Sequence, residues 1–290
     1  MDFDLSPAQQ EMKAALRAFL LRECPIEYVR ECDEAERFPT ELFDKLAAGG
    51  WLGLPIPEEY GGTGGSCTDL VVILEELAWH FEAAANCYYT TVVIAADALT
   101  HFGSEEQKRA LLPRLARGEI RFAFSLSEPN SGSDAASLRT RAVLQGDEWV
   151  INGQKMFCSC AQVADYILLM ARSDAEAPKH DGITMFLLDP KTPGVDIRRL
   201  RKLGLKPMDL NEIFLGDVRV AKDAIIGGVN QGWRNVLKTL DYERCCLSAV
   251  NVGAARSCLD RALSYTKERE QFGQKISSFQ LTRAKLADME

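Results

Sequence analysis

Residues 122–137 read "FAFSLSEPNSGSDAAS", and at this stretch the kind of structure that the sequence predicts changes. The apolar segment "FAFSL" is short and typical of a buried strand. The residues after it are mostly small or polar, so the main chain there carries little side chain. Such a run indicates either an exposed turn between two strands or a loop that binds a ligand through backbone and hydroxyl groups.

Before this stretch, the apolar residues recur at helical spacing. Ser6 and Gln9 have the spacing of a capping box at a helix start, and Ser104 and Gln107 repeat it. A third helix is expected over 41–48, where Gly49 would end it. The apolar run 88–99 continues the helical pattern. The first part of the chain is therefore predicted to be a helical bundle.

After the stretch, the spacing becomes that of strands. Residues 142–159 alternate around Asn152 and Gly153, and an Asn-Gly pair is a strong hairpin signal. The segments 165–171 and 183–189 are typical of buried strands. Several short strands with turn signals between them favour a small barrel or sandwich. From about residue 230 to 268 a long helical pattern returns.

The sequence thus predicts an α+β protein of several domains. We expect an N-terminal helical bundle over 1–120, a middle β-barrel or β-sandwich domain over 121–228, and a C-terminal helical region over 229–290. A chain of 290 residues is long enough for two or three such units around a shared interior.

The composition argues against nucleic-acid binding, membrane insertion and metal binding. A net charge of -8 argues against a nucleic-acid partner, because neutralising phosphates takes a basic surface. No apolar run approaches the roughly 18 residues of a membrane span, and the N-terminus lacks the features of a targeting signal, so a cytoplasmic protein is expected. The cysteine count of 9 is odd, which favours free thiols, and the 3 scattered histidines make a metal site improbable.

One acidic residue falls on an apolar helix face. Glu243 lies in the middle of an apolar stripe on the predicted helix 230–268, so its carboxylate is expected to face the interior. Burial raises the pKa of a carboxyl group and can produce a base near neutral pH, although the adjacent Arg244 would lower that pKa. The alternative is a structural glutamate paired with an arginine of another helix. The stripe consists of Val236, Leu240, Leu247, Val250 and Ala254.

Four motifs in one order carry a family resemblance. The segments "FSLSEPNSGSDAAS", "EWVINGQKMFCSCAQVADYILLMARS", "LDYERC" and "REQFGQKISSFQ" resemble those of the acyl-CoA dehydrogenase family. "PIPEEYGGTGGS" and "FGSEEQKRALLPRLARGE" are similar to its helical N-terminal part. The resemblance implies a helical domain, a β domain and a C-terminal helical bundle. This chain is expected to hold only part of the C-terminal bundle. It also implies bound FAD and an acyl-CoA substrate.

The resemblance implies a reaction and a base. In the family, a glutamate removes a proton from the carbon α to the thioester and flavin N5 accepts a hydride from the β carbon, which gives a trans-2-enoyl-CoA. The base lies either on a late loop or on the helix that here carries "DYER", and this chain has the second arrangement, with Glu243.

The resemblance also assigns binding residues. The flavin ring would be lined by Phe124, Leu126 and Ser127 and by Phe157 and Ser159, where many members have tryptophan in place of Phe157. Gly132 and Ser133 would approach the FAD pyrophosphate or the coenzyme A, with Gly132 free to take a positive φ. Arg269, Gln271, Phe272 and Gln280 would hold the adenosine end of FAD in a neighbouring subunit. Asp241, Tyr242 and Arg244 would touch the acyl-CoA, with Arg244 near its adenosine part.

The implied partners are an electron-transferring flavoprotein as electron acceptor and further copies of the chain, in a dimer or tetramer, if the full C-terminal domain is present. Three alternatives stay open: a flavin oxidase of the same fold, a reductase that acts on an enoyl-CoA, and a non-catalytic scaffold or fragment. Tyr88, Tyr89 and Trp79 are candidates for pocket walls, although core positions are the favoured interpretation.

Overall fold

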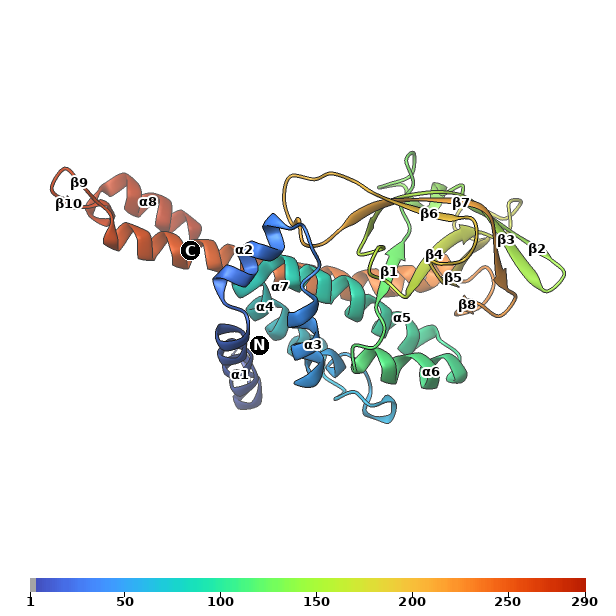
Figure 1. Cartoon of the computed structure of the whole chain (residues 1–290), viewed down its shortest axis with the longest axis horizontal. Coiled ribbons are helices and arrows are strands. Elements are labelled where there is room, and N and C mark those ends of the chain that lie inside the picture. Colours follow the sequence, from blue (N-terminus) through green and yellow to red (C-terminus); the bar gives the residue numbers. More distant parts are fainter. Residues whose placement is uncertain (1–3) are drawn as a thin grey trace.

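The structure is a computed structural model that describes residues 4–290, so residues 1–3 of the expected N-terminal domain lie outside the described residues. It has a helical part, a β part and a long C-terminal helix that passes along both (Figure 1). This arrangement confirms the predicted fold class. The N-terminal helices are α1 (Pro7–Glu23), α2 (Ile26–Glu34), α3 (Thr40–Ala48), α4 (Cys67–Tyr88), α5 (Ile94–Phe102) and α6 (Glu105–Ala116).

Side-chain caps fix where the N-terminal helices begin. Both predicted capping boxes are present, since the hydroxyl oxygens of Ser6 and Ser104 accept hydrogen bonds from the backbone N–H groups of Gln9 and Gln107, each at 3.2 Å. A third box, with Ser66 and Asp69, starts α4. This box was not predicted, because its third helical position holds aspartate and the usual pattern has glutamate or glutamine there.

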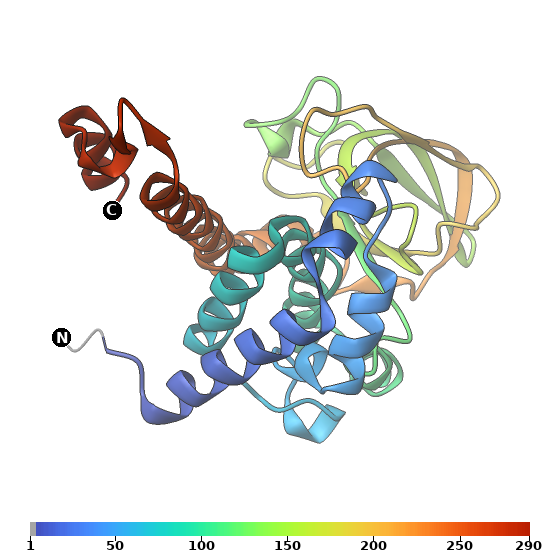
Figure 2. The same cartoon turned by 60° about the vertical axis from the view of Figure 1, so that its left-hand side comes forward.

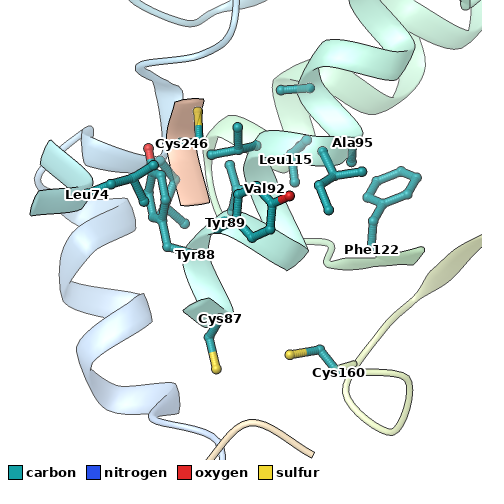
Figure 3. Packing of buried hydrophobic residues seen from close by; sticks show 14 of the residues in the cluster. Leu74, Cys87, Tyr88, Tyr89, Val92, Ala95, Leu115, Phe122, Cys160 and Cys246 are labelled. Atoms are coloured by element: carbon teal, nitrogen blue, oxygen red, sulfur yellow. The ribbon is translucent and has the colours of Figure 1, made fainter. Parts of the chain in front are cut away.

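Helix α4 is not regular to its end. Phe81 interrupts it with φ -148° and ψ 88°, and a π-helical turn, Tyr89–Val93, joins it to α5. The run 88–99 was predicted as ordinary helix, so the π turn is a correction. Figure 3 shows Tyr88 and Tyr89 in the interior, where Cys246 from the C-terminal helix also lies.

Within residues 4–290, eight strands form one sheet in the order β6-β7-β3-β2-β4-β5-β8, and β1 pairs in parallel with β4. Alternate residues of the strands serve two cores. Phe122 and Leu168 pack with the helices, whereas Ala123 and Ile167 pack inside the sheet. The strands are β1 (Phe122–Ser125), β2 (Arg141–Gln145), β3 (Glu148–Ser159), β4 (Tyr166–Arg172), β5 (Ile183–Leu188), β6 (Val195–Arg199), β7 (Leu210–Ala221) and β8 (Ile225–Ile226).

The predicted hairpin at Asn152 and Gly153 is wrong. The turn between β2 and β3 lies at Gly146, which has φ 64°, and Gln145 pairs with Glu148 across it. Gly153 instead lies inside β3, at a register shift against β7. A β-carbon on Gly153 would lie 2.7 Å from the Cα of Thr140, so glycine is required there for strand packing.

The C-terminal helix α7 (Gly232–Glu268) crosses the molecule and packs along α4. Its apolar stripe is only partly buried: Val236 and Val250 are in the core, but Leu247 is exposed, contrary to the prediction. After α7 come β9 (Glu270–Gln271), β10 (Gln274–Lys275) and α8 (Gln280–Met289), which project from the helical part on the side away from the sheet (Figures 1 and 2).

The structure also answers two questions about membrane spans and disulfides. In residues 4–290 no helix combines the length and the hydropathy that crossing a membrane requires. The cysteines of this part are all free thiols, as the sequence analysis expected.

Candidate active site

Glu243 is buried on α7, with 7% of its surface exposed. Its Oε2 accepts a hydrogen bond from the hydroxyl of Tyr89 at 3.1 Å. Within residues 4–290, Oε1 is buried and has no hydrogen-bond partner. The alternative of an arginine from another helix is therefore wrong, because the partner that the structure gives this carboxyl group is a phenol.

The surroundings of Glu243 raise its pKa to about 7. Burial is the main cause, because it disfavours the charged form. The hydrogen bond from Tyr89 opposes it, the carboxylate of Asp97 on α5 adds to it, and Arg244 opposes it weakly. A carboxyl group with such a pKa can both accept and release a proton near neutral pH.

The "DYER" sequence is divided between two faces of α7. Asp241 and Arg244 are exposed and paired with each other, with 2.7 Å between Oδ1 and the guanidinium nitrogen. Tyr242 is half-buried and lines a cleft of about 400 Å³ together with Asp97 and His101. Because helical residues three apart share a face, the sequence directs Glu243 and Tyr242 inward while its flanking charges reach solvent.

The loop after β1 is held by a buried ion pair. Lys155 is fully buried on β3, and its Nζ donates to Glu128 Oε1 at 2.9 Å and to the carbonyl oxygen of Leu126 at 3.0 Å. Glu128 also accepts from the backbone N–H groups of Arg139 and Thr140 at 2.6 and 2.9 Å. These bonds fix both ends of the loop that the sequence analysis singled out.

An aromatic ring is exposed beside this loop. Phe157 lies in an irregularity of β3, has φ 61° and exposes 62% of its surface. A positive φ is strained for an aromatic residue, and such strain gathers at functional sites. Nearby, Phe124 and Leu126 are partly buried, as are Ser127 and Ser159. A flat ring system fits this surface, where apolar side chains and hydroxyl groups meet.

The outer part of the loop is open. Gly132 and Ser133 are exposed, and a β-carbon on Gly132 would meet nothing within 4 Å. Although a glycine can take a positive φ, Gly132 does not adopt one in this structure. The next residue, Asp134, pairs with Lys179 at 2.6 Å. His180, the residue after Lys179, lines a cleft of about 520 Å³ together with Asp181, Trp233 and Arg234.

The π-helical turn connects the two halves of the site. It packs against β1, and Tyr89 from it reaches Glu243. Phe124 and Leu126 pack on the same buried cluster that contains Tyr89 and Cys246. The carboxyl group at 243 is thus buried, and its partner Tyr89 belongs to the cluster on which Phe124 and Leu126 pack.

The remaining predicted residues lie elsewhere. Arg269, Gln271, Phe272 and Gln280 are exposed at the C-terminal end, far along α7 from the loop after β1 (Figure 1). The structure therefore does not bring them to the same site as Phe124 or Glu243. Their placement is compatible with the expected contact to a neighbouring subunit.

The chain matches three family models in succession. The N-terminal domain of acyl-CoA dehydrogenases matches residues 6–119, the middle domain matches 123–218 and the C-terminal domain matches 230–290. The chain belongs to the acyl-CoA dehydrogenase family. It is therefore an oxidoreductase of a flavoprotein family.

Relatives of known sequence or structure agree with this assignment. A probable acyl-CoA dehydrogenase of Bacillus subtilis, YngJ, is 37% identical over 290 residues, which are 100% of this chain and 76% of that protein. The CarC subunit of the caffeyl-CoA reductase-Etf complex of Acetobacterium woodii is 35% identical over 98% of this chain and 75% of its own length. A glutaryl-CoA dehydrogenase from Mycobacterium smegmatis, solved in complex with FADH2, has a TM-score of 0.89 and 30% identity, covering 98% of this chain and 72% of that one.

Sequence reasoning missed two parts of the site. Tyr89 was expected in a pocket wall or the core, and its contact with Glu243 links positions 154 apart in the sequence. Tyr88 is a core residue as favoured, whereas Trp79 is partly exposed and its indole N–H donates to Asp260 at 2.7 Å. The Glu128–Lys155 pair was not considered, although a lysine inside an apolar strand is a signal for a buried ion pair.

Proposed function

We propose that this protein catalyses the FAD-dependent α,β-dehydrogenation of an acyl-CoA thioester, with Glu243 as the base. One observation carries the proposal: a buried carboxyl group with a pKa of about 7 and one unpartnered oxygen lies on the helix where some family members have their base. Membership of the family supports the reaction class.

FAD fits the residues of the loop after β1. The exposed ring of Phe157 and the partly buried Phe124 and Leu126 offer an apolar surface for the flavin ring, with the hydroxyls of Ser127 and Ser159 at its edge. The FADH2 bound by the structural relative from Mycobacterium smegmatis supports this cofactor. When bound, FAD supplies the acceptor for the hydride that leaves the β carbon.

Glu243 would take the proton from the α carbon onto Oε1, the oxygen without a partner. The C–H electron pair then forms the α,β double bond as the β carbon loses its hydride. Asp241, Tyr242 and Arg244 would bind the acyl-CoA on the solvent side of this position. The residues Gly132 and Ser133 would approach the pyrophosphate of FAD or the coenzyme A. In a neighbouring copy of the chain, the adenosine end of FAD would be bound by Arg269, Gln271, Phe272 and Gln280.

A second function is favoured by one relative. CarC belongs to a caffeyl-CoA reductase complex with an electron-transferring flavoprotein, so the reverse reaction on an enoyl-CoA is the second candidate. In that direction a protonated Glu243 would give its proton to the α carbon. An electron-transferring flavoprotein is the proposed electron partner in either direction.

The test is an anaerobic titration of the FAD-loaded protein with acyl-CoAs of several chain lengths. Acyl-CoA should bleach the flavin, and Glu243→Gln should slow the bleaching by about 10²–10⁴-fold while FAD stays bound. Glu76→Gln is the control, since Glu76 is also buried but pairs with Arg17 at 2.7 Å. Bleaching by Glu243→Gln at the unchanged rate would rule out this base. Rapid reoxidation by air with release of peroxide would instead identify an oxidase.

A further inference from the structure

The π-helical turn contacts α7 through the side chain of Tyr89. Tyr88 and Tyr89 are both buried, but their hydroxyls have different partners. The hydroxyl of Tyr88 donates to the carbonyl oxygen of Trp51 at 2.8 Å, and that of Tyr89 donates to Glu243 at 3.1 Å. A π turn widens the helix by one residue per turn and so redirects the side chains that follow it. Here it begins at Tyr89 itself.

We propose that Tyr89 is a positioning residue for Glu243: it holds Oε2 so that Oε1 alone is left to exchange the proton with the substrate. This inference rests on the proposed function, because it assigns a role to a neighbour of the proposed base. Oε1 is the buried oxygen without a partner, which is the arrangement expected if substrate is to be its partner.

Tyr89 stays a donor over the whole working range. Burial, followed by the nearby charge of Glu243, raises the pKa of its phenol well above the usual range. The hydrogen bond therefore favours the ionised form of Glu243 and lowers the pKa of that carboxyl group. Tyr89 thus offsets part of the rise that burial causes in the pKa of Glu243.

Other titratable groups also interact with Glu243. Asp97 on α5 raises the pKa of Glu243, and Arg244 on α7 lowers it. The thiol of Cys246, on the next turn of α7, has its own pKa raised to about 12 by burial, so it is neutral. Among these groups Tyr89 is the one that makes a hydrogen bond to the carboxylate.

The direct test is an infrared titration of the protein without substrate, in which the spectrum of Glu243→Gln is subtracted to isolate the carboxyl band of Glu243. The midpoint is expected near pH 7 in the unchanged protein. In Tyr89→Phe it should rise by about one pH unit or more, because a hydrogen bond to a charged group is lost. Tyr88→Phe removes the hydroxyl of a neighbouring buried tyrosine whose partner is Trp51, and it should leave the midpoint unchanged. An unchanged or lower midpoint in Tyr89→Phe would overturn the proposal.

A second measurement needs no substitution at residue 89. With tyrosines labelled with ¹³C at Cζ, one signal should shift with a midpoint near pH 7 in the unchanged protein and stay constant in Glu243→Gln. If no tyrosine signal follows this titration, the contact does not exist in solution and the proposal fails, even where Tyr89→Phe does not fold.

The kinetic result separates a positioning role from a structural one. In Tyr89→Phe the acidic limb of the pH–rate profile should move to higher pH by the same interval as the infrared midpoint, with the plateau rate largely kept. An equal loss of rate at every pH would contradict the proposal. Because neither spectroscopic test depends on substrate turnover, a shifted midpoint in a protein that acyl-CoA does not bleach would reject the proposed function and leave the role of Tyr89 intact.

Discussion

Glu243 links the chemistry of single residues to the stability of the fold. Its pKa is about 7 in the folded chain and near the ordinary 4.5 in the unfolded chain. The folded state therefore binds the proton more tightly, and the group contributes stability that is fully present below pH 4.5 and is lost as the pH rises through 7.

We predict that the free energy of unfolding falls by about 3 kcal/mol from this group between pH 4.5 and 8, since each pKa unit corresponds to about 1.4 kcal/mol. Urea unfolding at a series of pH values measures it. In Glu243→Gln this part of the pH dependence should vanish. An identical slope in the variant and in the unchanged protein would show that the carboxyl group is not desolvated in the folded state.

Lys155 and Glu128 give a second prediction at this scale. Burial lowers the pKa of Lys155 to about 8, and Glu128 works against that shift. Lys155→Met leaves a buried carboxylate without its cation and should cost about 3–5 kcal/mol in urea unfolding. Arg198→Ala, which breaks the exposed pair with Asp196, should change the stability far less, because solvent screens that pair. Similar costs for the two variants would contradict the burial of the first pair.

Single residues also mark the limit of sequence-based reasoning about the site. Glu243 could be found because an acid inside an apolar helical stripe is unusual and visible in one segment. The contact of Tyr89 with Glu243 could not be found in this way. It depends on a π turn that no residue pattern predicted and on a partner in a helix far along the sequence. The apolar pattern also could not predict that Leu247 is exposed, because its exposure depends on which helices pack against α7.

Among the elements, helix starts were predictable and one strand turn was not. A capping box is a local hydrogen-bond pattern within four residues, so Ser6 and Ser104 announce it without tertiary information. The choice between Gly146 and Gly153 as the hairpin turn depends on pairing with β7, which lies far along the chain. Both glycines follow a polar residue between strand-like segments, and local sequence therefore favoured the wrong one.

Two glycines of the β part give a matched test at the scale of elements. Gly153→Ala should lower the melting temperature, because the new β-carbon would meet the backbone of Thr140. Gly132→Ala has open space and should leave the melting temperature unchanged. If FAD or coenzyme A approaches the loop there, the same change should weaken FAD binding or raise KM, as flavin fluorescence and steady-state kinetics would measure. A large loss of stability in Gly132→Ala would contradict the open loop.

At the scale of the whole molecule, apolar side chains are exposed on the C-terminal part. Leu281 is 79% exposed on α8, and Phe272 is 93% exposed between β9 and β10. Val252 and Leu247 are also exposed, farther back along α7. Large apolar side chains exposed in this way favour association with another polypeptide.

We therefore predict that the chain self-associates through its C-terminal part. Sedimentation velocity should give a molar mass above 32.2 kDa that rises with concentration. Leu281→Glu should weaken the association, whereas Leu203→Glu, at a residue 98% exposed on the β part, should not. Equal effects of the two substitutions would mean that the contact is not specific to the C-terminal part.

The unbroken course of α7 has a consequence for how subunits share work. Glu243 and Arg269 are 26 residues apart on or just after one continuous helix, which corresponds to about 39 Å at 1.5 Å per residue. A helix of that length keeps the proposed base, Glu243, and the proposed adenosine-binding segment from Arg269 to Gln280 apart within one subunit. If that segment binds the FAD of a neighbouring subunit, two inactive variants should complement each other. A mixed oligomer of a variant with a defective segment and a variant without the Glu243 carboxylate should then contain one competent active site.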